Sequence, residues 1–176
     1  GGFLCAPGRH GEFRPAGGRR GAMRMIQGLV DWLEPQSDGR GEAGPLSVAL
    51  ERVRHAVRPG SLVVVISDFF SMDEDCHRHL SRLHQHNDVI GCQVLDAAEY
   101  RLPQGRYPIS DGTDTAVLDM GQGESRKRYE SMVHRHTEEP RRMFQKHQCG
   151  WFVLHTDDDP VDVLGRELRL LVGRPV

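Results

Sequence analysis

The segment Leu62–Phe70 constrains the fold of this chain more than any other. It opens with an uninterrupted, β-branched apolar run and reaches its first charged side chain at Asp68. A strand that is apolar on both faces is typical of a parallel sheet with helices on both sides. We therefore expect a parallel strand here that is covered on both faces. Asp68 would lie just past its carboxyl end, where open α/β sheets keep their ligand crevice.

Apolar periodicity and turn residues predict further strands and helices around this segment. The other expected strands are Gly2–Cys5, Glu12–Pro15, Val89–Leu95, Thr115–Asp119 and Gly150–Thr156. The expected helices are Arg20–Glu34, Leu46–Val57, Asp73–His86, Glu124–Gln148 and Pro160–Val172. A kink or a break is expected at Pro140, and a polar, glycine-rich connection over residues 35–44. Three strands that are each followed by a helix predict an α/β fold with a mainly parallel sheet.

Size and composition exclude several functional classes. A chain of 176 residues suits one domain, which we take to span residues 1–176. The formal net charge of -2 argues against a nucleic-acid partner. No apolar stretch approaches the roughly 18 residues of a membrane span, so we expect a cytoplasmic chain without membrane contact. The four cysteines show no CxxC spacing and are expected to be reduced.

Three of the predicted strands end at an aspartate, namely Asp68, Asp96 and Asp157, and Ser67 precedes the first of them. In a parallel sheet these side chains gather along one edge. Carboxylates there can bind Mg²⁺ through oxygen ligands or act as a general acid and base. An aspartate after a strand also starts turns or caps the next helix. The cap is favoured for Asp157–Asp159, and both interpretations stay open for Asp68.

Other catalytic patterns are absent from the sequence. It contains no GxSxG nucleophile elbow and no GxxxxGK[ST] phosphate loop. The segment Cys76–His86 is rich in histidine and could suggest zinc, but its histidines do not line one helix face. A solvated helix is the better interpretation. Apart from the acidic edge, nothing in the sequence indicates an enzyme.

Three segments resemble the von Willebrand factor type A-like domain of domain-of-unknown-function family 58, bacterial proteins often encoded beside MoxR-type AAA+ ATPases. They are Pro59–Phe69, which contains Ile-Ser-Asp-Phe, then Asn87–Asp96 and Glu99–Pro103. The resemblance implies a Rossmann-like sheet flanked by helices, with a metal-ion-dependent adhesion site at its carboxyl edge. In the wider type A fold that site combines a DxSxS motif on the first strand, a threonine on a later loop and an aspartate after the fourth strand.

Asp68 matches the aspartate of that site, and the other two elements have no counterpart. No DxSxS motif occurs, and the loop Gly41–Leu46 contains no threonine. The resemblance therefore implies a partial domain whose central first strand lies upstream of Gly1, and a degenerate metal site with Asp68 as its surviving ligand. It also implies that the intact protein carries membrane segments upstream.

Taken together, these features predict a protein-interaction module and not an enzyme. The resemblance implies a MoxR-type AAA+ ATPase as its partner, in a chaperone-like or assembly role. The alternative is a Mg²⁺-dependent phosphoester hydrolase that uses Asp68, Asp96 and Asp157 as ligands. It requires those carboxylates to converge within about 4–6 Å. A third hypothesis is a scaffold whose site has decayed.

Overall fold

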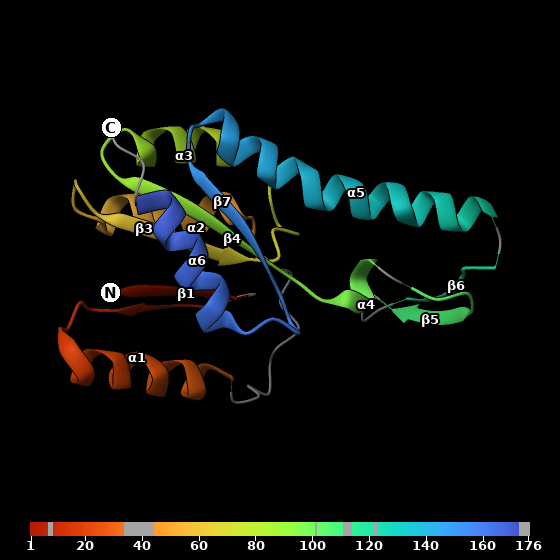
Figure 1. Cartoon of the computed structure of the whole chain (residues 1–176), viewed down its shortest axis with the longest axis horizontal. Helices are drawn as coiled ribbons and strands as arrows, with labels where there is room; N and C mark the ends of the chain where they lie inside the picture. Colours follow the sequence, from red (N-terminus) through yellow and green to blue (C-terminus); the bar gives the residue numbers. More distant parts are fainter. Residues whose placement is uncertain (7–8, 34–43, 101, 111–113, 122, 173–176) are drawn as a thin grey trace. The chain divides into compact units, whose positions relative to one another are not determined.

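A computed structural model of the chain describes residues 1–6, 9–33, 44–100, 102–110, 114–121 and 123–172. Its strands are β1 (Gly2–Ala6), β2 (Arg9–Phe13), β3 (Leu62–Ser67), β4 (Asp88–Leu95), β5 (Arg106–Ser110), β6 (Thr115–Asp119) and β7 (Gly150–His155). Its helices are α1 (Gly18–Leu33), α2 (Leu46–Ala56), α3 (Asp75–His84), α4 (Ala97–Tyr100), α5 (Gly123–Lys146) and α6 (Pro160–Val172). Figure 1 shows these elements coloured along the chain.

The chain divides into two compact units. The first comprises Gly1–Val57 and Ser71–His79, and the second comprises Arg58–Phe70 and Leu80–Val176. Helix α3 begins in the first unit and ends in the second. The expectation of a single domain stays a prediction.

The first unit contains a β-hairpin, formed by β1 and β2, with α1 packed against it. The two strands are antiparallel, with Gly2 opposite Phe13. A Cβ atom at Gly28 of α1 would lie only 2.0 Å from the Phe13 ring, so glycine is what lets the helix approach this closely. The second strand of this hairpin begins earlier than predicted, at Arg9, because it pairs along the full length of β1.

The second unit contains the predicted parallel sheet, with strand order β3-β4-β7. Helix α6 packs on one face of it, where Val163 joins a cluster formed by Ile90, Cys92 and Phe152. Helix α5 packs on the other face through the Phe144 ring. Figure 1 shows the two helices on opposite sides of the three strands. The predicted α/β fold, a parallel sheet flanked by helices, is confirmed at this level.

The prediction that both faces of β3 are covered is wrong, although it holds for β4. Along β4 the residues from Val89 to Gln93 are all buried. On β3 alternate side chains are exposed, with Leu62 at 50%, Val64 at 39% and Ile66 at 65%. β4 is the central strand, with Phe144 of α5 packed on one face and Val163 of α6 on the other, whereas β3 is an edge strand of this sheet.

Helix α5 runs unbroken through Pro140 from Gly123 to Lys146, so the break considered from the sequence does not occur. A short helix, α4, was not predicted, and the Tyr129 hydroxyl of α5 donates a hydrogen bond to the Glu99 carbonyl of α4. The predicted strand Thr115–Asp119 is β6, and it forms a hairpin with β5. The connection predicted over residues 35–44 lies outside the described residues, except for Gly44. Within the described part, no helix is both long and apolar enough to span a membrane.

Candidate functional site

Ser67 and Asp68 end strand β3, and both bind the backbone of their own loop. The Phe70 N–H donates to Asp68 Oδ1 at 3.0 Å, and the Phe69 N–H donates to Ser67 Oγ at 3.0 Å. Bonds from a side chain to the backbone two residues on are the mark of Asx and Ser/Thr turns. The turn interpretation of Asp68 is thus realised here. Its side chain remains exposed, so the charge is also presented to solvent.

The residue after Asp68 has an unusual backbone conformation. Phe69 lies at φ 64°, a left-handed region that non-glycine residues rarely occupy. Its ring is only 2% exposed and packs against Phe144 and Trp151, with ring centroids 5.5 Å and 5.0 Å away. This aromatic packing compensates for the backbone strain. Phe70 then points outward, 60% exposed, and stacks on the His136 ring at a centroid distance of 3.7 Å.

Gln93 of β4 holds the same loop from inside the sheet. It is fully buried and lies opposite Ser67 in the register of β3 and β4. Its Nε2 donates to the Asp68 carbonyl at 3.2 Å and to the His136 carbonyl of α5, also at 3.2 Å. Sequence analysis missed this residue. Its signal was a lone amide in an otherwise apolar strand, since a buried polar side chain needs a partner.

Asp96 ends strand β4, and it is tied to the neighbouring strand. Its carboxylate accepts hydrogen bonds from the Thr156 hydroxyl at 2.5 Å and from the Ala98 N–H at 2.8 Å. The bond from Thr156, followed by that from Ala98, lowers the pKa of the Asp96 carboxyl. The structure therefore joins the ends of β4 and β7, and Asp96 also begins the short helix α4.

The three aspartates that follow β7, Asp157–Asp159, have different roles. Asp159 precedes α6 and caps it, because its Oδ1 accepts the Val161 N–H at 2.8 Å. Asp158 accepts the His155 N–H at 2.8 Å. Asp157, the residue named as a site candidate, is exposed. The predicted helix cap therefore lies within this run, at its last member.

These carboxylates do not form a metal site of ordinary composition. Within the described ranges, no group of three or more His, Cys, Asp or Glu side chains is arranged to hold a metal ion. Asp68 and Asp96 direct oxygens at backbone N–H groups instead. The residues present therefore do not fit the full ligand set of an adhesion-type Mg²⁺ site. A shallow, mainly apolar pocket lies nearby, lined by Phe70, His136 and Met132 among others.

The sequence matches the model of a known protein family. The model of a family described as "Protein of unknown function DUF58" matches residues 2–139, which is well over half of the chain. The chain belongs to the DUF58 family. The matched range includes the Asp68 loop and Gln93, and it ends one residue before Pro140. No curated protein and no solved structure matches the chain.

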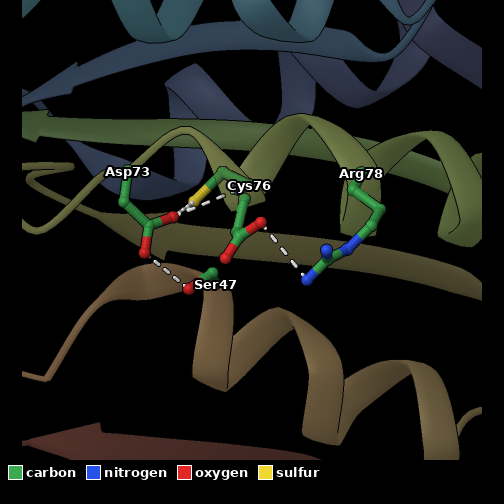
Figure 2. Close-up of polar contacts among 5 residues, drawn as sticks. Ser47, Asp73, Cys76 and Arg78 are labelled. Carbon is green, nitrogen blue, oxygen red and sulfur yellow. Dashed lines mark hydrogen bonds and ion pairs between the residues drawn. The ribbon is translucent and has the colours of Figure 1, made fainter.

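Three of the four cysteines of this DUF58 chain are buried. Burial raises the pKa of Cys76 to about 12 and that of Cys92 and Cys149 to about 11, so all three stay protonated at neutral pH. Figure 2 shows Cys76 in the first unit, where its Sγ lies 3.1 Å from Asp73 Oδ1. The other Asp73 oxygen accepts the Ser47 hydroxyl at 2.6 Å. This network joins α2 to the start of α3.

Proposed function

We propose that this DUF58 protein is an interaction module that binds a MoxR-type AAA+ ATPase in a chaperone-like or assembly role. In this proposal its sheet is the Rossmann-like sheet of a von Willebrand factor type A-like domain, and the partner meets the carboxyl edge of that sheet. The partner is implied by the family resemblance. The observation that carries the proposal is the loop after β3, where the Asp68 carboxylate and the Phe70 ring are exposed within two residues of each other.

The physical chemistry of this loop suits recognition. Aromatic side chains are prominent among the residues that dominate binding energies at protein interfaces, where they become buried in a pocket of the partner. The loop is also ordered before a partner arrives, by the Asp68 turn, the buried Phe69 ring and the Gln93 amide. Ordering in advance reduces the entropy lost on binding. Asp68 supplies a negative charge, so the complementary feature on the ATPase is a basic side chain next to an apolar pocket.

The hydrolase alternative has no specific observation in its favour. It needs carboxylates that share a metal ion, and Asp68 and Asp96 each serve a turn of their own. In the type A-like interpretation Asp68 is the one matching position of a degenerate site, and its role is that of a recognition charge.

A binding measurement with matched variants tests the proposal. The affinity of the wild-type chain for a purified MoxR-type ATPase is compared with those of Asp68→Ala, Phe70→Ala and Asp88→Ala. Asp88 is an exposed aspartate at the opposite, amino end of the sheet, which makes it the matched control for the loss of one charge. We expect Phe70→Ala to weaken binding by roughly tenfold or more, which is the size of effect found at interface hot spots.

The other variants separate the possible outcomes. Asp68→Ala should weaken binding less than Phe70→Ala and mainly at low salt, because an exposed charge is screened by ions. Asp88→Ala should bind like the wild type. The proposal fails if the wild-type chain does not bind the ATPase, or if all three variants bind equally well.

A further inference from the structure

Helix α5 contains a buried proline, Pro140, and yet continues on both sides of it. Proline has no backbone N–H, so it cannot donate the hydrogen bond that a helix normally directs to the carbonyl four residues earlier. In α5 that carbonyl belongs to His136. Pro140 therefore leaves a helix carbonyl without its usual donor in the part of α5 that faces the sheet.

The donor that replaces it comes from the sheet. Gln93 Nε2 lies 3.2 Å from the His136 carbonyl oxygen and 3.2 Å from the Asp68 carbonyl oxygen. Only the NH₂ end of a glutamine amide can donate, and its two hydrogens satisfy two carbonyls. Because Gln93 is fully buried, water does not compete for either carbonyl. One amide thus links the helix with the loop that carries Asp68 and Phe70.

We propose that Pro140 and Gln93 form a conformational clamp, in which the His136 carbonyl that Pro140 leaves unpaired holds the Gln93 amide in place, and Gln93 in turn holds the Asp68–Phe70 loop. Displacement of α5 would then release the loop. Conversely, a ligand that displaces the loop would also displace α5, because coupling between two sites is reciprocal.

A second contact between the helix and the loop supports this coupling. Phe144 lies one helical turn beyond Pro140, and its ring packs edge-on against Phe69 with centroids 5.5 Å apart. The same short stretch of α5 therefore holds the Asp68 carbonyl through Gln93 and the strained Phe69 through its ring. The left-handed Phe69 conformation needs such external support, because it is unfavourable on its own.

The idea that the clamp orders a partner-binding loop rests on the function proposed above. The coupling between α5 and the Asp68–Phe70 loop does not depend on that function. Its test therefore uses no partner. Amide hydrogen exchange of Phe69 and Phe70 is measured by NMR on the whole chain, since both N–H groups are bonded within the loop. Global stability is measured on the same samples by denaturant unfolding.

Gln93→Met removes the donor at nearly constant volume, and Pro140→Ala adds a backbone N–H that competes for the His136 carbonyl. We expect each variant to accelerate exchange of both loop amides by roughly fivefold to tenfold, the effect of losing one hydrogen bond. Pro140→Ala should do so without lowering global stability in proportion, because alanine is the better helix residue. In the double variant the two accelerations should not add, since both remove the same link. Glu139→Ala, at an exposed neighbouring position of α5, is the control and should leave the loop unchanged.

Two results would overturn the clamp: wild-type exchange at Phe69 and Phe70 in Pro140→Ala, or additive effects in the double variant. If Gln93→Met does not fold, Pro140→Ala against Glu139→Ala still decides the question. If Pro140→Ala accelerates exchange of the loop amides but the ATPase does not bind the wild-type chain, the coupling is supported and the proposed partner is refuted. If the ATPase binds but Pro140→Ala leaves exchange unchanged, the partner is supported and the clamp is refuted.

Discussion

Strands β3 and β4 are neighbours with nearly the same apolar character, but they differ in how far their side chains are buried. Both are parallel strands rich in valine and isoleucine, and they pair in register from Leu62 opposite Asp88 to Ser67 opposite Gln93. β4 is buried on both faces, whereas β3 exposes every second side chain. A run of apolar residues thus indicates that a strand can be covered on both faces, and the elements that pack on each face decide whether it is.

The same contrast extends to the ends of the two strands. β4 ends at Asp96, which the neighbouring strand holds through Thr156. β3 ends at Asp68, whose carboxylate is bonded within its own loop and whose carbonyl is held from β4 by Gln93. The better-covered strand therefore provides the anchor, and the edge strand provides the exposed loop. This division of roles suits the proposed interaction surface, which needs a stable support.

The largest effect is expected in the middle of β4, at Gly91. A Cβ atom there would lie 2.5 Å from Trp151 Cε3 and 2.8 Å from Phe144 Cε1, and these rings cannot both move away within a packed core. We expect Gly91→Ala to lower the free energy of unfolding by about 3 kcal/mol, the upper range for overpacking. Denaturant unfolding followed by tryptophan fluorescence measures it.

The control for that prediction is Gly165→Ala on α6. No atom lies within 4 Å of the Cβ position there, so alanine should be neutral or stabilise by up to about 1 kcal/mol through its helix propensity. If Gly91→Ala were as stable as the wild type, the aromatic cluster over β4 would be looser than described, and the contrast between the strands would weaken.

A matched pair of valines tests the contrast directly. Val89 of β4 is 2% exposed and Val64 of β3 is 39% exposed. Removing the two methyl groups should cost about 2 kcal/mol in Val89→Ala, from lost burial and the resulting cavity, and under about 1 kcal/mol in Val64→Ala. Both follow from the same unfolding measurement. Equal losses would mean that β3 is covered in solution as β4 is, and the comparison would fail.

These differences mark how far the sequence could predict the structure. The apolar runs ending at Asp68, Asp96 and Asp157 predicted three parallel strands correctly, because period and composition are local properties. The open face of β3 was not predictable in that way, since it depends on what packs against that face in the folded chain. The same holds for the site: Asp68 could be placed from the sequence, whereas the bonds of Gln93 join carbonyls 25 and 43 residues away.

Pro140 is a case in which the sequence predicted a local feature but not its structural outcome. The sequence correctly marked it as a place where a helix loses a hydrogen bond, and a kink or break was the natural expectation. The helix continues through it, and the carbonyl that lost its usual partner accepts a hydrogen bond from Gln93 of the sheet. The sequence predicted that a helix carbonyl would lose its backbone donor, and only the tertiary structure determines which group replaces that donor.

The smallest effect concerns the ends of the strands and depends on pH. Thr156→Val removes the hydroxyl that does most to lower the pKa of Asp96, so that pKa should rise toward the ordinary aspartate value near 3.9. A carboxyl whose pKa is lower in the folded state stabilises the fold above its unfolded pKa, and this contribution is lost as pH falls through the folded pKa. Wild type should therefore exceed Thr156→Val in stability at neutral pH, and the gap should close below about pH 4. Thr156→Ser keeps the hydroxyl and should titrate like the wild type in an NMR titration of the Asp96 carboxyl. An Asp96 pKa that is the same in all three proteins would show that β7 does not hold the end of β4, and the two strand ends would then be alike.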